Sequence, residues 1–254
     1  MSIGCSGDYD EYSVDHKVPE QHVFQTRLDC CYLLHVPADT GHNPLLVTAL
    51  HGYSSNPEVM LRLTVGLVGS DCVVAAIQAP YQHYVSAGLP DGQSVPGYNW
   101  GISKHWESTV RLHHDMVRHV LSDLRGRFQV GAERCLLAGF SQPVGLNYRF
   151  AATHPEQVAG VIGICGGVPR DWEEPKYKPV TAAVLHISRE NDEFYPADVA
   201  ATFPDRLRRH ASDVEFYLLP GTHRFPSKAD KIVRPWLDRV FGQRAAEPAG
   251  RLSV

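Results

Sequence analysis

The chain has 254 residues, of which 43% are apolar and 20% charged, and its formal net charge is −4. This length suits one large domain with a substantial core, and this composition excludes a largely disordered chain. The negative charge offers no attraction to phosphate backbones or anionic lipids, so no binding to nucleic acid is expected.

The two ends of the chain differ from its middle. Residues 1–20 are polar and acidic, without the basic start and apolar run of a secretory signal, and we expect a flexible leader there. Residues 243–254 are expected to form a flexible tail. No stretch reaches the ~18 continuous apolar residues of a spanning helix, so no integral membrane segment is expected. The cysteines include no C-x-x-C pair and are expected to be reduced, buried thiols of a cytoplasmic protein.

Short apolar runs alternate with helical patterns between these ends. Residues 31–36 predict a strand ended by Pro37, and residues 22–28 are a candidate hairpin partner. Further strands are predicted at 45–50, 72–77, 135–138, 158–164, 182–187 and 214–219, and helices at 106–124, 143–153, 197–210 and 227–241. The strands do not alternate apolar with polar residues, which is typical of strands covered on both faces.

This order predicts an α/β fold with a mainly parallel central sheet and helices on both faces, in a single domain over residues 21–242. Parallel strands are joined by right-handed crossovers, so functional loops gather at the carboxyl ends of the strands. Candidate site residues are therefore sought directly after predicted strands.

The strongest signal is a serine at a strand-to-helix turn. Residues 136–143 read Leu-Leu-Ala-Gly-Phe-Ser-Gln-Pro, an apolar strand followed by Ser141 and a helix. This is close to the G-x-S-x-G turn that exposes a nucleophilic serine hydroxyl. Gly139 leaves room for the turn. Pro143 stands where glycine is usual, but proline is acceptable in a first helical turn because the N–H that it lacks would be unpaired there. We therefore expect Ser141 to be a nucleophile.

A nucleophilic serine needs a histidine as base and a carboxylate that orients the base. Glu190, Asp192 and Glu193 lie in the loop after one later strand, and His223 lies in the loop after the last. The chain order serine, acid, histidine is the one found with this type of turn. We expect His223 to be the base, and among the three carboxylates we prefer Asp192 as the acid.

Free backbone N–H groups beside the serine would stabilise an oxyanion. Gln142 follows Ser141 at the start of the predicted helix, where N–H groups are unpaired. Tyr53 follows His51 and Gly52 at the end of an earlier strand. We expect the N–H groups of Tyr53 and Gln142 to form an oxyanion hole, and His51 to brace this loop as a structural histidine.

Four segments together resemble the phospholipase/carboxylesterase group of α/β-hydrolases, which includes acyl-protein thioesterases. They are His51-Gly52, Gly139-Phe140-Ser141-Gln142, Asp192 with Pro196, and Gly221-Thr222-His223. The likeness covers about residues 30–240. It implies an α/β-hydrolase fold, a serine hydrolase without a cofactor, the triad Ser141-Asp192-His223, and oxyanion donors at Tyr53 and Gln142. The chain departs from the group at Pro143-Val144, where paired glycines are usual, and in a longer acid loop.

Residues 79–106 form a long segment rich in aromatic side chains. Loops of this length are typical of lids and binding loops. We expect Tyr98 and Trp100 to contact substrate; the alternative is that these aromatic side chains cover apolar sheet surface.

These residues predict a serine carboxylesterase that hydrolyses small-molecule esters through an acyl-enzyme on Ser141. The same residues could act on thioesters or peptide bonds, transfer the acyl group to another alcohol, or persist in a catalytically silent fold used for binding. No metal site is expected, because His113 and His114 are adjacent on a helix and no H-E-x-x-H motif is present. The oligomeric state stays open, with a homodimer as one alternative.

Overall fold

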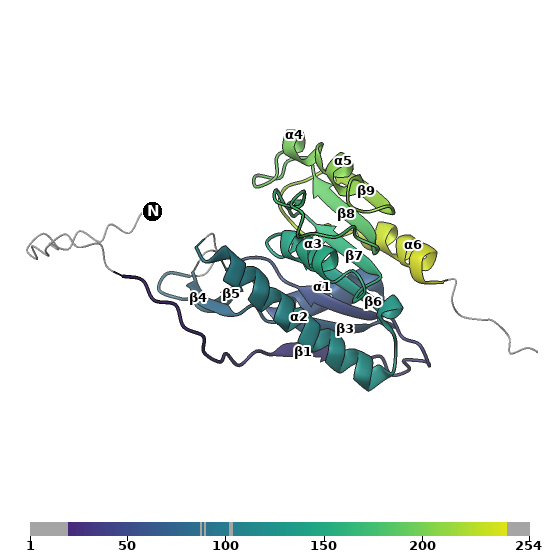
Figure 1. Cartoon of the computed structure of the whole chain (residues 1–254), viewed down its shortest axis with the longest axis horizontal. Helices are drawn as coiled ribbons and strands as arrows, with labels where there is room; N and C mark the ends of the chain where they lie inside the picture. Colours follow the sequence, from purple (N-terminus) through teal and green to yellow (C-terminus); the bar gives the residue numbers. More distant parts are fainter. Residues whose placement is uncertain (1–19, 87, 89, 102–103, 243–254) are drawn as a thin grey trace, which may run out of the picture.

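A computed structural model describes residues 20–242 apart from 87, 89, 102 and 103 (Figure 1). The expected tail at 243–254 lies outside the described residues, and so does the expected leader at 1–20 except for Glu20. Between them the chain folds around one central sheet.

The central sheet has seven strands in the order β1-β3-β2-β6-β7-β8-β9. Every neighbouring pair is parallel except β1 with β3. The strands are β1 (Tyr32–His35), β2 (Leu46–Leu50), β3 (Val73–Ile77), β6 (Cys135–Phe140), β7 (Gly160–Ile164), β8 (Ala183–Arg189) and β9 (Val214–Leu219). The predicted mainly parallel α/β sheet is therefore confirmed.

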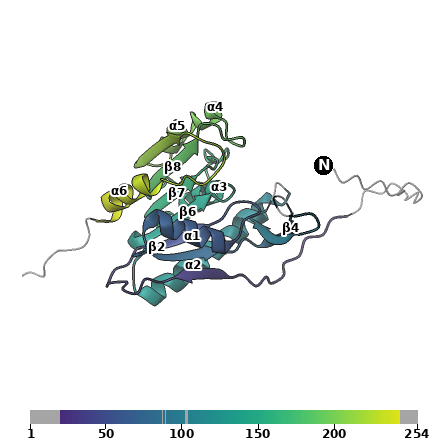
Figure 2. The same cartoon turned by 180° about the vertical axis from the view of Figure 1, so that it is seen from behind.

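Helices cover both faces of this sheet. They are α1 (Pro57–Val68), α2 (Trp106–Phe128), α3 (Val144–Thr153), α4 (Ala197–Ala200), α5 (Phe203–Arg208) and α6 (Asp230–Phe241). Figure 1 shows α2 and α3 in front of the sheet, and the view from behind in Figure 2 shows α1 in front. Alternate strand residues point to opposite faces, so the core divides into two apolar layers. One layer includes Leu121 of α2 and Phe150 of α3. The other includes Met60 of α1 and Trp236 of α6.

Three expectations from the sequence are wrong in detail, and one helix was not expected. Residues 22–28 form no strand and are exposed. The helix expected at 197–210 is two short helices, because Pro204 lies in the first turn of α5 and cannot continue a helix from α4. Helix α1 was not predicted, although Asn56 caps it by accepting the Val59 N–H at 2.9 Å. Cys30 and Cys31 are exposed rather than buried.

The segment expected to be a loop at 79–106 contains a β-hairpin. Strands β4 (Tyr81–Val85) and β5 (Val95–Asn99) pair antiparallel as a separate two-stranded sheet. The hairpin joins the rest of the molecule through a bridge between Tyr98 and Ser55, with Tyr98 N–H to Ser55 O and Ser54 N–H to Tyr98 O both at 3.0 Å. It is therefore attached beside the carboxyl end of β2.

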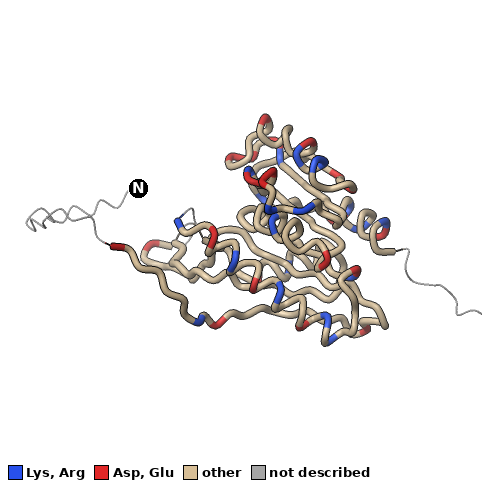
Figure 3. The backbone as a smooth tube through the Cα atoms, viewed as in Figure 1, with Lys and Arg blue, Asp and Glu red and all other residues tan. Residues whose placement is uncertain are grey.

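Charged residues of both signs are interspersed over the described chain (Figure 3). Such a mixed surface is ordinary for a globular protein. Within the described residues, none of the helices is long and apolar enough to cross a membrane.

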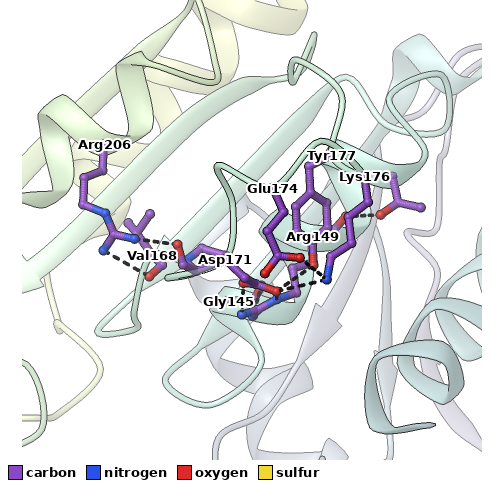
Figure 4. Close-up of polar contacts among 10 residues, drawn as sticks. Gly145, Arg149, Val168, Asp171, Glu174, Lys176, Tyr177 and Arg206 are labelled. Atoms are coloured by element: carbon purple, nitrogen blue, oxygen red, sulfur yellow. Dashed lines mark hydrogen bonds and ion pairs between the residues drawn. The ribbon is translucent and has the colours of Figure 1, made fainter. Parts of the chain in front are cut away.

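A polar cluster holds the irregular connection from β7 to β8 against α3 (Figure 4). The Arg149 guanidinium donates to both oxygens of Asp171, at 3.2 and 2.5 Å, and to the Gly145 carbonyl at 3.1 Å. Tyr177 donates its hydroxyl to Asp171 at 3.0 Å. Burial alone would raise the pKa of Asp171, but the hydrogen bonds and positive charge of Arg149, together with Tyr177, lower it below its ordinary value.

We predict that Asp171→Asn lowers the free energy of unfolding by about 1–2 kcal/mol at pH 7, because the largely buried Arg149 loses its counter-charge. The pKa of Asp171 is lowered in the folded state, so its stabilisation is present above about pH 4 and lost as the pH falls through the folded pKa. Urea unfolding at pH 7 and pH 3 should therefore show a difference between wild type and variant that shrinks in acid.

The matched control for this change is Glu174→Gln. Glu174 is exposed and pairs with Lys176 at 2.8 Å, so its loss should change stability by less than about 0.5 kcal/mol. Equal effects of the two substitutions would contradict a special role of the Arg149–Asp171 pair.

Candidate active site

Ser141 lies at a sharp turn between β6 and α3. Its backbone has φ +63°, in the left-handed region that costs a non-glycine residue of order 1–3 kcal/mol. The Ser141 N–H donates to Ile164 O at 2.8 Å, which ties the turn to the end of β7. A side chain at Gly139 would lie 2.7 Å from the Asn147 amide, so this glycine is required by packing. The serine is thus held in a strained conformation by its surroundings.

Pro143 fits this turn without breaking the helix behind it. Its φ of −77° and ψ of −8° are helical, and its carbonyl accepts the Asn147 N–H at 2.8 Å. The neighbouring Val144 is accommodated by glycines on the other side of the turn. A Cβ at Gly166 would overlap Val144, and one at Gly163 would lie 2.8 Å from Val144 Cγ1. The space usually provided by small residues after the serine is provided here by β7 and the turn that follows it.

Three side chains from separate loops form a continuous hydrogen-bond chain. His223 Nε2 lies 2.8 Å from Ser141 Oγ, and His223 Nδ1 lies 2.7 Å from Asp192 Oδ2. An ionised carboxylate only accepts, so Nδ1 carries the imidazole proton and the Nε2 lone pair faces the serine hydroxyl. The geometry is that of a nucleophile, a base and an orienting acid.

The carboxylates near His223 have different partners. The Asp192 side chain is 1% exposed, and its Oδ1 accepts the N–H groups of Phe194 and Tyr195 at 2.9 and 3.0 Å. Glu193 accepts the backbone N–H of His223 at 3.2 Å and does not reach the imidazole. Glu190 is exposed. Of the three acids considered from the sequence, Asp192 is the one that contacts the imidazole.

The loop after β2 lies directly against Ser141. A Cβ at Gly52 would lie 3.3 Å from Ser141 Cβ and 3.0 Å from Phe140 Cδ1, so glycine permits this close approach. Neither the Tyr53 N–H nor the Gln142 N–H has an acceptor within the described part of the chain. The arrangement leaves two donors beside the serine.

His51 supports this loop and has no free nitrogen for proton transfer. Its Nδ1–H donates to Gly52 O at 2.8 Å, and its Nε2 accepts the Ala79 N–H at 3.1 Å. Burial lowers the pKa of His51, which favours the neutral ring that these two bonds need. This is the bracing position expected for His51 from the sequence.

Trp100 connects the two segments that carry the free N–H groups. Its indole N–H donates to His51 O at 2.8 Å, and its backbone N–H donates to Gln142 Oε1 at 2.9 Å. Gln142 Nε2 in turn donates to Gly101 O at 2.6 Å. Because Trp100 is only 1% exposed, its ring packs in the core. This agrees with the alternative that the aromatic side chains of residues 79–106 cover apolar sheet surface. Tyr98 is half-buried in the adjacent β5.

His83 and Asn99, for which no sequence pattern predicted a role, link the hairpin to the loop after β2. His83 Nε2 lies 2.8 Å from Ser54 Oγ, and Asn99 Nδ2 lies 3.2 Å from His83 Nδ1. The Asn99 Oδ1 accepts the Gly101 N–H, so its Nδ2 donates and His83 must accept at Nδ1. The Tyr53 ring stacks on His83 with centroids 5.0 Å apart. Such pairings depend on the fold and leave no pattern in the sequence.

His113 and His114 are both buried in the packing of α2. His113 donates from Nε2 to Asn147 Oδ1 at 3.2 Å. Burial lowers the pKa of His114 to about 3 and that of His113 well below its ordinary value, so both rings are neutral at neutral pH. In residues 20–242, excluding the gaps at 87, 89 and 102–103, no three His, Cys, Asp or Glu side chains form a group that could hold a metal ion.

We predict that Trp100→Phe lowers the free energy of unfolding by about 1–3 kcal/mol, because the buried His51 carbonyl loses its donor. Urea unfolding measures this change. Trp106→Phe is the matched control: Trp106 is half-buried, and its indole N–H has no acceptor among the described residues. Equal stability of the two variants would show that the bond to His51 does not stabilise the fold.

No known protein family's sequence profile matches this chain, and no curated protein sequence matches it. Solved structures do match. The Bacillus cereus carboxylesterase has a TM-score of 0.63 at 15% identity, with 84% of this chain and 95% of that chain covered. Esterase PE8 has 0.66 at 21%, covering 84% and 100%, and the Mesorhizobium loti carboxylesterase has 0.65 at 17%, covering 84% and 96%. The likeness to these structures shows that the chain has the α/β-hydrolase fold found in carboxylesterases.

Proposed function

We propose that this protein is a serine carboxylesterase that hydrolyses small-molecule esters through an acyl-enzyme on Ser141. The observation that carries the proposal is the chain Ser141–His223–Asp192, with bonds of 2.8 and 2.7 Å, beside two free backbone N–H groups. The carboxylesterases among the structural neighbours support the choice of ester chemistry. No cofactor is needed, because these protein groups supply a nucleophile, a base and an oxyanion site.

In the first step, Ser141 Oγ attacks the ester carbonyl while His223 Nε2 takes the serine proton. Asp192 holds the imidazole in the tautomer with Nδ1 protonated and stabilises the imidazolium that forms. The proton on Nε2 then passes to the leaving alcohol oxygen as the carbon–oxygen bond breaks. The acyl group stays on Ser141 as an ester.

In the second step, water takes the place that the alcohol has left. His223 Nε2 removes a proton from the water as its oxygen attacks the acyl carbonyl, and returns a proton to Ser141 Oγ as the acid departs. In both steps the carbonyl oxygen becomes negative. The N–H groups of Tyr53 and Gln142 bind it, and each such donor contributes roughly 3 kcal/mol.

We propose that Tyr98 and Trp100 act differently from each other. Tyr98 is half-buried at the hairpin edge beside Ser55, and we propose that its exposed part contacts substrate. Trp100 is almost fully buried, and we propose that it positions the oxyanion donors through His51 and Gln142.

We also propose that the protein works in the cytoplasm. Cys30 and Cys31 are exposed free thiols, and exposed thiols persist in reducing compartments.

We predict that Ser141→Ala abolishes both ester turnover and labelling by a fluorophosphonate probe, because the probe needs the activated hydroxyl.

Asp192→Asn should lower kcat by about 10⁴-fold, because the imidazole then takes the wrong tautomer. Turnover of p-nitrophenyl esters and gel detection of the probe are the two measurements.

The control is Ser122→Ala, which changes an exposed serine on α2 and should leave both readings unchanged. Ester turnover that survives Ser141→Ala in a clean preparation would remove Ser141 from its role. Wild type that is not labelled would favour a silent binding protein. Matched ester, thioester and amide substrates separate the esterase from a thioesterase or peptidase.

We predict that Gln142→Ala lowers kcat about tenfold with little change in KM. The backbone N–H remains, but the side-chain bonds to Trp100 and Gly101 that hold it in place are lost. Steady-state kinetics on a p-nitrophenyl ester measures both constants. A rise in KM with unchanged kcat would instead mean that Gln142 binds substrate in its ground state.

A further inference from the structure

We propose that Phe194 contacts the leaving alcohol and selects esters of uncharged, apolar alcohols. This inference rests on the proposed esterase function and goes beyond it by naming the substrate group and the side chain that recognises it. Phe194 is 67% exposed, a large apolar side chain held beside the catalytic imidazole.

Three aromatic rings surround the His223 imidazole. The Phe194 ring packs edge-on, with centroids 4.7 Å apart, while Phe140 and Tyr195 lie at 5.3 and 6.2 Å. Phe140 and Tyr195 also pack against the core. Phe194 is the one whose surface remains largely free for another molecule.

The backbone of Phe194 is fixed by the same carboxylate that orients the imidazole. Asp192 Oδ1 accepts the Phe194 N–H at 2.9 Å while Oδ2 pairs with His223 at 2.7 Å. The backbone that carries the exposed ring is therefore fixed relative to the imidazole. A ring on a free loop would lose more entropy on binding a ligand.

The reaction itself brings the alcohol to this ring. The leaving oxygen must take its proton from His223 Nε2, so it lies within hydrogen-bond distance of that atom. Substituents on the oxygen then lie against the imidazole, and the exposed Phe194 ring packs on that imidazole with centroids 4.7 Å apart. An alkyl or aryl group in this place buries apolar area against the ring.

A carboxylate near His223 explains why an uncharged alcohol is preferred. Glu193 accepts the backbone N–H of His223 at 3.2 Å, and Asp192 lies on the far side of the imidazole. The Glu193 carboxylate disfavours an anionic alcohol near His223 and leaves an uncharged one unaffected. The chemistry around His223 thus fits neutral alkyl and benzyl alcohols.

The test compares two series of esters on wild type and Phe194→Ala. One series keeps butyrate and varies the alcohol from ethanol to butanol and benzyl alcohol; the other keeps ethanol and varies the acid. We expect Phe194→Ala to lower kcat/KM for benzyl butyrate about tenfold and for ethyl butyrate less than twofold. Discrimination among the acids should not change. Phe194→Leu should restore most of the benzyl preference.

The rate at which the acyl-enzyme is hydrolysed distinguishes recognition of the alcohol by Phe194 from a merely structural role. Esters of one acid share the same intermediate, so deacylation after a single turnover should proceed at the wild-type rate in Phe194→Ala. Phe24→Ala, which removes another exposed phenyl ring, should leave both series unchanged.

A uniform fall in kcat/KM for all esters would overturn the inference, since Phe194 would then only shield His223. Unchanged selectivity would overturn it as well. Failure of the proposed function is recognised separately, because wild type would then hydrolyse neither series and Ser141 would not be labelled by fluorophosphonate.

Discussion

The left-handed backbone of Ser141 is the constraint on which the site depends. A serine with φ +63° is unfavourable in isolation and persists because neighbouring segments leave no room for an alternative. Its N–H is bonded to the end of β7, glycines at 52 and 166 let two other segments approach it, and Gly139 leaves room for α3 beside β6. Adding side chains at these glycines would push the elements apart. The strain at Ser141 is thus compensated by packing elsewhere, and the result is a hydroxyl that faces His223.

The main features of the fold and the three central side chains were predictable because topology orders them. Apolar runs without alternation indicated the buried strands, and parallel strands bring their carboxyl ends to one edge. Ser141, Asp192 and His223 each follow such a strand, so their meeting could be expected. Helix α1 could also have been predicted, because Asn56 followed by Pro57 is a strong helix start.

Other features depend on contacts that no local pattern records. The hairpin at 81–99 is not obvious, because its turn contains two glycines and a proline, a second proline lies in β5, and its strands are short. The roles of His83 and Trp100 follow from the Ser54, His51 and Gln142 atoms that they reach. A tryptophan in an aromatic segment can line a pocket or fill a core, and only the burial of Trp100 separates the two.

The site consists of two halves that are held together internally and meet at Ser141. In one half, Trp100 bonds both the loop that carries Tyr53 and the side chain of Gln142, so the two proposed oxyanion donors are held by one residue. In the other half, Asp192 bonds both His223 and Phe194, so the base and the exposed ring share one anchor. In the proposed mechanism, the first half fixes where negative charge develops, and the second fixes where the proton is delivered. The proposed chemistry and the proposed leaving-group recognition should therefore be separable by substitution, because they depend on different carbonyl, amide and carboxylate anchors.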